Sequence, residues 1–211
     1  MGKLNLADLK SLDKTKREEA WRTLEAQLAG DYRPLLKYRL FLRSLLWSNV
    51  QGVREQAWEH LPLYKRLSVK GIERTFSHRS ERVRLTAWQN YTVCLELGIV
   101  NKAQLLRLKQ HFWRLLRSYY PTVKKRAWRL VPSLVDHEII TSRDSERIIN
   151  FLRYRRANVR IMAWYYSSYL LERRVLSREQ LEDSLTYLRD LTNFESNISR
   201  KAKRILKSLE S

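Results

Sequence analysis

Cysteine, glycine and proline are scarce in this chain of 211 residues, which contains one, five and four of them. The single cysteine excludes an internal disulfide, so nothing in the sequence suggests secretion. The glycine-rich phosphate-binding motifs GxxxxGKS/T and GxGxxG are both absent. No apolar run approaches the roughly 20 residues that cross a bilayer, and the N-terminus lacks the apolar core of a signal peptide. We therefore expect a cytoplasmic protein without a membrane partner, associated with the nucleoid or with ribosomes if nucleic acid is its ligand.

Acidic residues are also in short supply, with 22 Asp and Glu against 42 Lys and Arg and a formal net charge of +20. Because 44% of the residues are hydrophobic, the chain can bury a core and is not a disordered polycation. The excess is uneven, since the segment from Lys102 to Arg160 holds 15 basic residues and 4 acidic ones. Charge of this size points to the partner rather than to the fold. Nucleic acid is the first candidate, ahead of an anionic membrane surface.

A hexapeptide pattern recurs along the chain: an aliphatic residue, a basic residue, two variable positions, Ala and Trp. Four copies begin at Val53, Val83, Val123 and Val159, and degenerate copies lie at 16–21 and 198–203. The copies are 30 to 40 residues apart, a period typical of helical repeat proteins. The aliphatic residue and the Ala are four residues apart, so they mark the buried stripe of one helix, which we call helix B.

A second apolar stripe precedes each B helix. Apolar residues stand twelve and sixteen residues before the Trp position, one helical turn apart, which predicts a helix A joined to B by a short turn. Asn101, Thr141 and Ser177 have the side chains and sequence context of helix N-caps. Pairs of helices, A followed by B, are therefore the expected repeating unit.

Proline positions and the absence of strand patterns complete the predicted fold. Pro121 fits the first turn of a B helix, whereas Pro62 and Pro132 fall inside B helices and should kink or end them. No alternation typical of strands is present. We expect one repeat domain over residues 1–211, with repeats at approximately 4–30, 34–66, 68–97, 101–135, 141–173 and 177–210.

This pattern resembles the HEAT-repeat family, whose second helix typically opens with Val-Arg, two variable residues and Ala. The resemblance covers roughly Leu4 to Leu209. It implies an all-α fold, a right-handed α–α superhelix of about six antiparallel helix pairs whose B helices line the concave side. HEAT arrays serve as protein scaffolds, transport receptors and nucleic-acid binders, and a more distant HEAT-like group removes alkylated bases from DNA.

The basic residue and the Trp of each copy are also four residues apart, so they share a helix face rotated about 100° from the Val/Ala stripe. The resemblance puts this face at or near the concave groove, where basic and aromatic groups suit a polyanion that carries bases. We predict a nucleic-acid interface formed by Arg54, Arg84, Lys124, Lys125, Arg129, Arg155, Arg156, Arg160, Trp88, Trp128 and Trp164.

A structural role for the same face stays open. Each Trp equally fits a wedge between adjacent B helices, with its indole N–H bonded to a backbone carbonyl. In HEAT arrays the basic residue pairs with an acid near the start of a neighbouring B helix, but the only nearby acids here are Asp13, Glu81 and Glu195. Most of the basic residues would then lack an acidic partner and could pair with phosphate.

An enzymatic function has less support. A HEAT-like glycosylase is expected to place a carboxylate one turn from a groove Trp, and Glu25 alone fits, whereas Asp136 and Glu138 lie at the far end of a B helix. The four histidines show no metal-ligand spacing, and Cys94 lies in an apolar run expected in the core. We predict no catalytic residue, no metal and no cofactor.

The predicted function is therefore non-enzymatic binding of the nucleic-acid phosphate backbone. Duplex DNA is slightly preferred over structured RNA, because a curved basic groove matches the width of a duplex. Two alternatives remain: a HEAT-like glycosylase for alkylated bases, and a protein scaffold whose groove holds an acidic peptide or partner helix.

Overall fold

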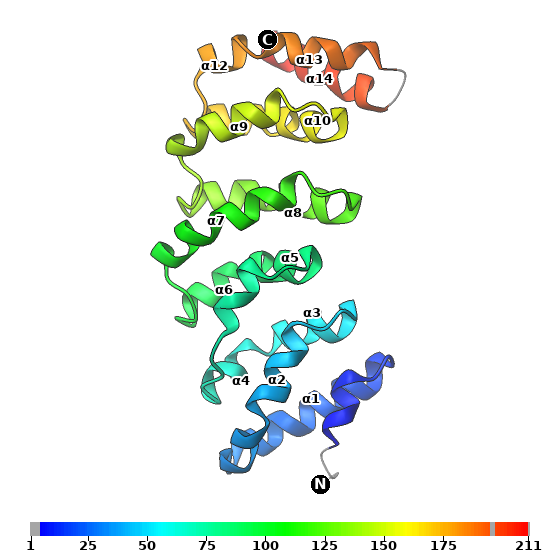
Figure 1. Ribbon diagram of the computed structural model, residues 1–211, viewed down its shortest axis with the longest axis vertical. Helices are drawn as coiled ribbons and strands as arrows, with labels where there is room; N and C mark the ends of the chain where they lie inside the picture. The colour runs from blue at the N-terminus through cyan, green and yellow to red at the C-terminus, as the bar shows by residue number, and fades with distance from the viewer. Residues whose placement is uncertain (1–4, 195–196, 211) are drawn as a thin grey trace. The chain divides into compact units, whose positions relative to one another are not determined.

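The computed structural model describes residues 5–194 and 197–210 (Figure 1). Within these two ranges all regular secondary structure is helical, without a strand, and consecutive helices pack on one another. The predicted all-α, solenoid-like fold is therefore confirmed. The chain divides into two compact units, residues 1–112 and 113–211, and the boundary lies within helix α7 (Lys102–Leu116). Leu4, where the first predicted repeat begins, and Glu195 lie outside the described residues.

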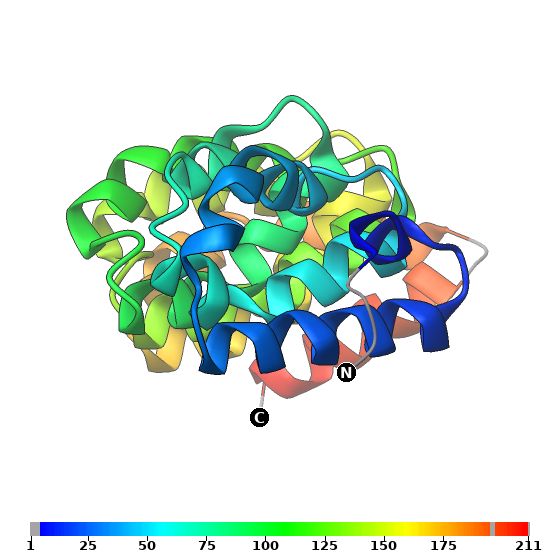
Figure 2. The same ribbon diagram turned by 90° about the horizontal axis from the view of Figure 1, so that it is seen from below.

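In unit 1 a first helical segment packs back on the segment that follows it, three times in succession. The 3₁₀ helix η1 folds over the long helix α1 (Figure 2), α2 packs on α3, and η3 packs on α5. Helix α3 also packs on α5, so adjacent repeats meet through their B helices. The elements are η1 (Leu6–Lys10), α1 (Lys14–Ala29), η2 (Arg33–Tyr38), α2 (Arg39–Leu46), α3 (Gln51–Glu59), α4 (Leu61–Arg66), η3 (Ile72–Ser77), α5 (Glu81–Gln89) and α6 (Tyr91–Glu96).

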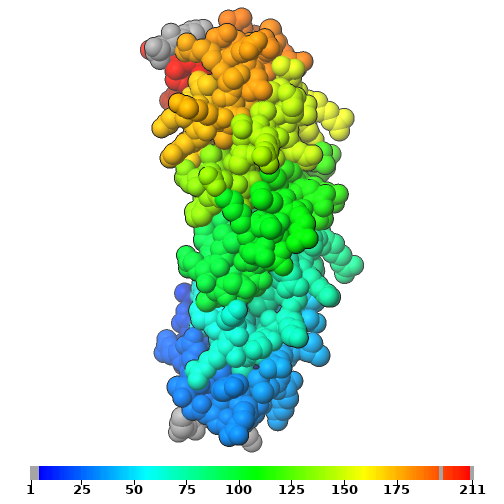
Figure 3. All heavy atoms as spheres, turned by 90° about the vertical axis from the view of Figure 1, so that its left-hand side faces the viewer, coloured from blue at the N-terminus to red at the C-terminus, as the bar shows by residue number. Residues whose placement is uncertain are grey.

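Unit 2 follows the same plan. Helix α9 packs on α10, and α13 with η5 packs on α14, while α10 contacts the B helices on both sides, α8 and α14. In the space-filling view the colours of each unit succeed one another in chain order (Figure 3), as expected when repeats touch only their neighbours. The elements are α8 (Pro121–Asp136), η4 (Ser142–Asp144), α9 (Ser145–Leu152), α10 (Ala157–Tyr165), α11 (Ser167–Glu172), α12 (Arg178–Glu182), α13 (Leu185–Arg189), η5 (Asp190–Asn193) and α14 (Asn197–Glu210).

The predicted N-caps are confirmed as capping boxes. Asn101 Oδ1 accepts from the Gln104 backbone N–H at 2.8 Å, and Gln104 Oε1 accepts from the Asn101 N–H at 2.8 Å. Thr141 and Ser177 form the same reciprocal pair with the residue three positions on. Because each box satisfies two orphan amide hydrogens, these residues help determine where the first helical segment starts in the last three repeats.

The predicted register of the two helices is also confirmed by burial. The six residues twelve positions before each Trp position are all 0% exposed. In the same way the aliphatic residue and the Ala of each complete pattern are at most 3% exposed. The six residues of the first helix are Leu9, Leu46, Phe76, Leu116, Leu152 and Leu191.

The B helices break in a way that proline only partly explains. Helix α3 gives way to α4 at His60, two residues before Pro62, as predicted. Similar breaks occur at Asn90 and Tyr166, where the sequence offers no proline. At Pro132 helix α8 continues, so of the two predicted outcomes, a kink or an early end, the early end does not occur. A proline inside a helix removes one hydrogen bond and can bend the helix without ending it.

The single cysteine is part of the core. Cys94 is 0% exposed, and burial raises the pKa of its thiol to about 12. A thiol with so high a pKa is almost entirely protonated near neutral pH, so it is neither a nucleophile nor a metal ligand there. The predicted core role of Cys94 is confirmed.

Candidate nucleic-acid interface

The tryptophans of the repeat pattern are core residues. Trp58, Trp88, Trp128 and Trp164 are at most 2% exposed. Each indole Nε1–H donates to the backbone carbonyl of the residue twelve positions earlier, over 3.0 to 3.3 Å. A base cannot reach rings in this position, so the prediction that Trp88, Trp128 and Trp164 contact the ligand is corrected. As in the alternative interpretation, each is buried and its indole N–H bonds to a backbone carbonyl, but the carbonyl belongs to the end of the preceding helical segment of the repeat.

The basic residue of each pattern is buried as well. We call the five of them the ladder residues, and between 3% and 9% of their surface is exposed. The prediction that these side chains lie open on a surface is therefore corrected, because the neighbouring B helix covers the face on which they stand. The ladder residues are Arg17, Arg54, Arg84, Lys124 and Arg160.

In unit 1 the ladder residues join each turn to the next repeat. Arg17 donates through Nη1 to the Ser11 carbonyl at 2.8 Å and through Nε to Gln56 Oε1 at 2.5 Å. Arg54 repeats this arrangement, with its Nε 2.9 Å from Thr86 Oγ1 in the following B helix. These acceptors are neutral carbonyl, amide and hydroxyl oxygens rather than carboxylates.

Arg84 has an acidic neighbour. Its Nη1 donates to the His78 carbonyl at 2.7 Å, and its Nη2 lies 3.9 Å from Glu81 Oε1. His78 lies in the same turn, where burial and the adjacent Arg79 lower the pKa of its imidazole. In this turn of unit 1 the carboxylate of Glu81 therefore partly balances the positive charge of Arg84.

The acceptors of the ladder change in unit 2. The position that supplies Gln56 and Thr86 in unit 1, two residues before the Trp position, is occupied by Met162 and Lys201. A thioether is a weak acceptor and an ammonium is none. The Nε of Arg160 is buried and has no hydrogen-bond partner in the described part of the chain. Lys124 and Arg160 therefore lack the side-chain acceptors in the following B helix that Arg17 and Arg54 have.

The other predicted cations of unit 2 are accessible. Lys125, Arg129 and Arg155 are exposed, and Arg156 is half-buried. Among the residues that the structure describes, no carboxylate oxygen lies within 4.0 Å of their charged nitrogens, or of those of Lys124 and Arg160. Six of the predicted interface residues thus carry positive charge without an acidic neighbour.

Arg156 brings two turns of unit 2 together. Its Nη2 donates to the backbone carbonyl of Arg117, and its Cζ lies 4.2 Å from the ring centroid of Tyr119 and 5.5 Å from that of Tyr154. A guanidinium over an aromatic ring is attracted by the negative face of the ring. The turn after α7 and the turn before α10 are therefore held side by side by one side chain.

Lys124 lies in the same region. Burial, and next the charge of Arg156, lower the pKa of its ammonium group. The second cause shows that two positive charges are close enough to repel one another. We call Arg117, Tyr119, Lys124, Arg155 and Arg156 the edge cluster.

The helices that start at the edge cluster lack side-chain caps. The N-cap residues of α8 and α10 are Tyr120 and Arg156, and neither side chain accepts a hydrogen bond from the first turn. The first backbone N–H groups of a helix then point outward unsatisfied, and the helix dipole adds partial positive charge. The side-chain cations and the N-termini of the two helices therefore both make the electrostatic potential at this edge more positive.

Carboxylates that an enzyme would need are engaged elsewhere. Glu25 Oε1 lies 2.7 Å from His60 Nδ1. Asp136 Oδ1 accepts from the Tyr169 hydroxyl at 2.7 Å and lies 3.2 Å from Arg173 Nη2. Among the described residues no group of three or more His, Cys, Asp and Glu side chains could hold a metal ion. These contacts supply no argument for a glycosylase, which stays an untested prediction.

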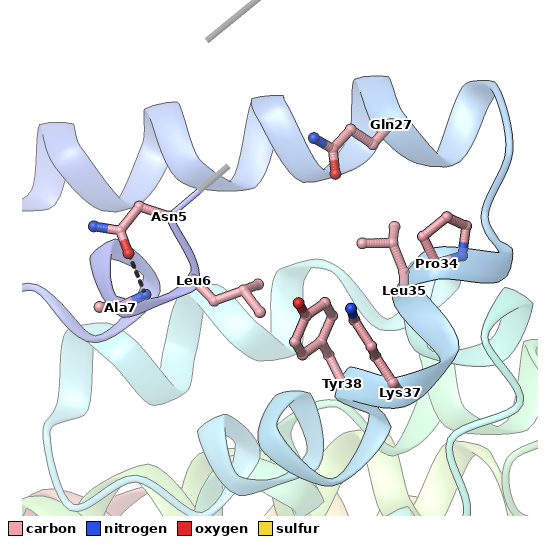
Figure 4. Close-up of a pocket in the computed structure, with 8 residues that line it drawn as sticks. All are labelled: Asn5, Leu6, Ala7, Gln27, Pro34, Leu35, Lys37 and Tyr38. Carbon is pink, nitrogen blue, oxygen red and sulfur yellow. Dashed lines mark hydrogen bonds between the residues drawn. The ribbon is translucent and has the colours of Figure 1, made fainter. Parts of the chain in front are cut away.

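A hollow of about 480 Å³ lies in unit 1, between α1 and η2 (Figure 4). Its polar lining consists of Asn5, Gln27, Lys37 and Tyr38. Lys37 Nζ is 5.0 Å from the ring centroid of Tyr38, and the two side chains point toward α1. The lining includes no carboxylate, imidazole or thiol, so the hollow offers no general acid, base or nucleophile.

Comparisons with known proteins add little to this geometry. No family model matches the chain, and no solved structure matches it. A segment of 64 residues is 38% identical to a protein of Acidianus ambivalens described as "Uncharacterized protein in sor 5'region". The segment covers 30% of this chain and 28% of that protein, so the match spans under a third of the relative's length. Separately, none of the helices in the described part of the chain combines the length and apolar character needed to cross a membrane.

The tyrosines at the edge cluster are not part of the hexapeptide pattern, because they lie in the turn between two helices. Tyr119 is 78% exposed and Tyr120 is 53% exposed. A signal for this region does exist in the sequence: no acidic residue occurs between Glu96 and Asp136. The acid-free segment includes the turn after α7 and most of α8, where three of the five edge-cluster residues lie.

Proposed function

We propose that this protein binds the phosphate backbone of nucleic acid, without chemistry, and that the edge cluster of unit 2 makes the contact. One observation carries the proposal: the cations around the two turns have no carboxylate within 4.0 Å among the described residues. Phosphate oxygens would supply the missing counter-charge. Arginine suits this role, because its guanidinium makes two parallel N–H···O bonds to one phosphate.

The buried position of Lys124 supports a functional role for its charge. It is 6% exposed, and both its burial and Arg156 disfavour the charged form. A purely structural position of this kind is better filled by an apolar residue, because removing an ammonium group from water is costly. Local conflicts of this type are typical of functional sites.

Exposed aromatic groups favour nucleic acid over an acidic protein as the partner. A scaffold groove for a partner helix is expected to expose aliphatic patches beside its charges. The large hydrophobic residues exposed in the described part of unit 2 are all aromatic: Tyr119, Tyr120, Tyr165 and Phe194. Aromatic rings between cations suit a ligand that carries bases.

A titration of the wild-type protein tests the proposal. Fluorescence anisotropy would be followed with labelled duplex DNA, single-stranded DNA, duplex RNA and polyglutamate, each at several salt concentrations. We expect the nucleic acids to bind with an affinity that falls steeply with salt, with a log–log slope of about −4 to −6 for five or so phosphate contacts. Polyglutamate should bind at least about tenfold more weakly, because it has no bases to stack on the exposed aromatic rings. Equal or tighter binding of polyglutamate would favour the acidic-partner scaffold, and no binding at all would refute both.

Replacing Lys124 with methionine should separate stability from binding. Met keeps the length of the side chain and removes a buried charge, so the free energy of unfolding should stay the same or rise by up to about 1 kcal/mol. Affinity for nucleic acid should fall through the loss of one positive charge beside the site, by less than the roughly tenfold expected for a direct charged hydrogen bond, because the ammonium group is almost fully buried. The matched control is Lys125→Met in the same helix turn, where the side chain is exposed and stability should change by less than about 0.5 kcal/mol. Chemical denaturation and the same titration measure both quantities, and a large loss of stability in Lys124→Met would contradict the argument.

A further inference from the structure

A chain of contacts between aromatic rings and a guanidinium group, which we call the stack, leads from the core of unit 2 to its surface; its inner ring pairs are edge-to-face and tilted. Phe151, which is 5% exposed, lies 5.6 Å from Trp128 and 6.0 Å from Tyr154 between ring centroids. Arg156 follows, 5.5 Å from Tyr154, and Tyr119 comes next, 4.2 Å from Arg156. Packing fixes the buried Phe151 and Trp128 rings. Arg156, which contacts Tyr154, in turn contacts the Tyr119 ring and so orients it.

Tyr119 ends the stack with most of its ring in solvent. Arg156 covers one side of the ring, yet 78% of the residue is exposed. A flat apolar surface that is held in place and left open is what a stacking ligand requires, because little side-chain entropy is lost on binding.

We infer that Tyr119 stacks on an unpaired base, and that Arg156 and Arg117 hold the adjacent phosphate. The inference rests on the proposed function and specifies its ligand as single-stranded DNA or RNA. In a duplex the faces of the bases are covered by their neighbours, whereas in a single strand each base has a face that an aromatic side chain can cover. Arg156 serves both contacts, since it lies over the Tyr119 ring and beside the Arg117 carbonyl.

Base stacking can be separated from phosphate binding with three ligands, of which the two single strands are matched in charge. These are an oligothymidylate of about ten nucleotides, an abasic oligomer of the same length, and a duplex. Each is titrated with the wild-type protein, with Tyr119→Ala and with Tyr119→Phe. Thermal unfolding of both variants checks the fold, which should be kept because the side chain is largely exposed.

Tyr119→Ala should weaken oligothymidylate binding by roughly 5- to 100-fold, the usual range for one stacked base. Binding of the abasic oligomer and of the duplex should change by less than about threefold, and Tyr119→Phe should bind like the wild type. Equal losses for oligothymidylate and the abasic oligomer would overturn the inference, because Tyr119 would then act only by positioning Arg156. That result would leave the proposed function standing. Failure of the wild type to bind any of the three ligands would refute both.

Discussion

Trp164→Ala is expected to lower the free energy of unfolding by about 3–5 kcal/mol, the usual cost of truncating a buried tryptophan. Trp164 is 0% exposed, and its Nε1–H donates to the Leu152 carbonyl at 3.0 Å. The substitution leaves a cavity and an unpaired carbonyl oxygen in the contact between α9 and α10. Urea denaturation followed by far-UV circular dichroism measures the change. A loss in the free energy of unfolding of less than about 1 kcal/mol would contradict the role of the tryptophans as core residues.

Two variants test whether Trp164 has any part in binding. Trp164→Phe keeps most of the apolar volume and loses the hydrogen bond, so it should remain folded with a cost of about 1–3 kcal/mol. Its affinity for nucleic acid should stay within about threefold of the wild type, because the ring lies out of reach of a ligand. Tyr119→Ala is the exposed counterpart, with a stability cost of about 1 kcal/mol or less. A selective loss of affinity in Trp164→Phe would restore the original prediction that tryptophans contact the ligand.

Reversing two charges at the edge of unit 2 should have the largest effect on binding. In Lys125→Glu/Arg155→Glu both side chains are exposed and have no acidic neighbour within 4.0 Å among the described residues, so the fold should tolerate the change. Loss of one charged contact is worth about tenfold, so the pair should weaken binding by roughly 100-fold. The salt dependence should fall by about two in log–log slope.

The matched control reverses two charges at the other end of the same helices. Arg143 precedes α9 and Arg174 follows α11, and both are exposed. Arg143→Glu/Arg174→Glu changes the net charge by the same amount, so an effect of overall charge alone would weaken binding equally in both variants. We expect the control to lose less than about fivefold, since these charges lie more than a Debye length from the edge cluster along the helix axis. Equal losses would mean that the protein is a non-specific polycation.

Much of the fold could be predicted, because local chemistry determines it. The positions of Leu46, Phe76 and Leu116 follow from helical periodicity alone, and capping residues such as Ser177 satisfy amides within one turn. The breaks at Asn90 and Tyr166 were missed, because no proline marks them. The resemblance to HEAT repeats stays a prediction, since no family model or solved structure matches the chain.

The candidate site could be predicted only in part, because helical periodicity gives the direction of a side chain but not what covers it. Arg54 and Trp88 share the predicted face, yet a neighbouring B helix packs over that face. The neutral acceptors Gln56 and Thr86 take the place of the expected acids. Lys125, Arg129 and Arg155 are exposed as predicted, because the turns and the outer helix surface have no covering element.

Tyr119 and Tyr154 could not be predicted from the repeat pattern, because neither residue belongs to it. Their importance comes from Arg156, whose side chain lies between the two rings and joins turns that are far apart in the sequence. A contact of this kind depends on tertiary packing, which periodicity does not encode. Clusters of turn tyrosines in an acid-free stretch are the sequence signal that would have drawn attention to them.

The measurement that tests the central claim most directly is backbone amide hydrogen exchange, with and without a saturating single-stranded oligonucleotide. The first turns of α8 and α10 lack side-chain caps, so their amides should exchange rapidly in the free protein. On binding, protection should appear in residues 117–125 and 153–160 and leave residues 141–147, at the opposite end of α9, unchanged. Protection confined to other segments, or spread evenly over the chain, would contradict the assignment of the edge cluster as the nucleic-acid interface.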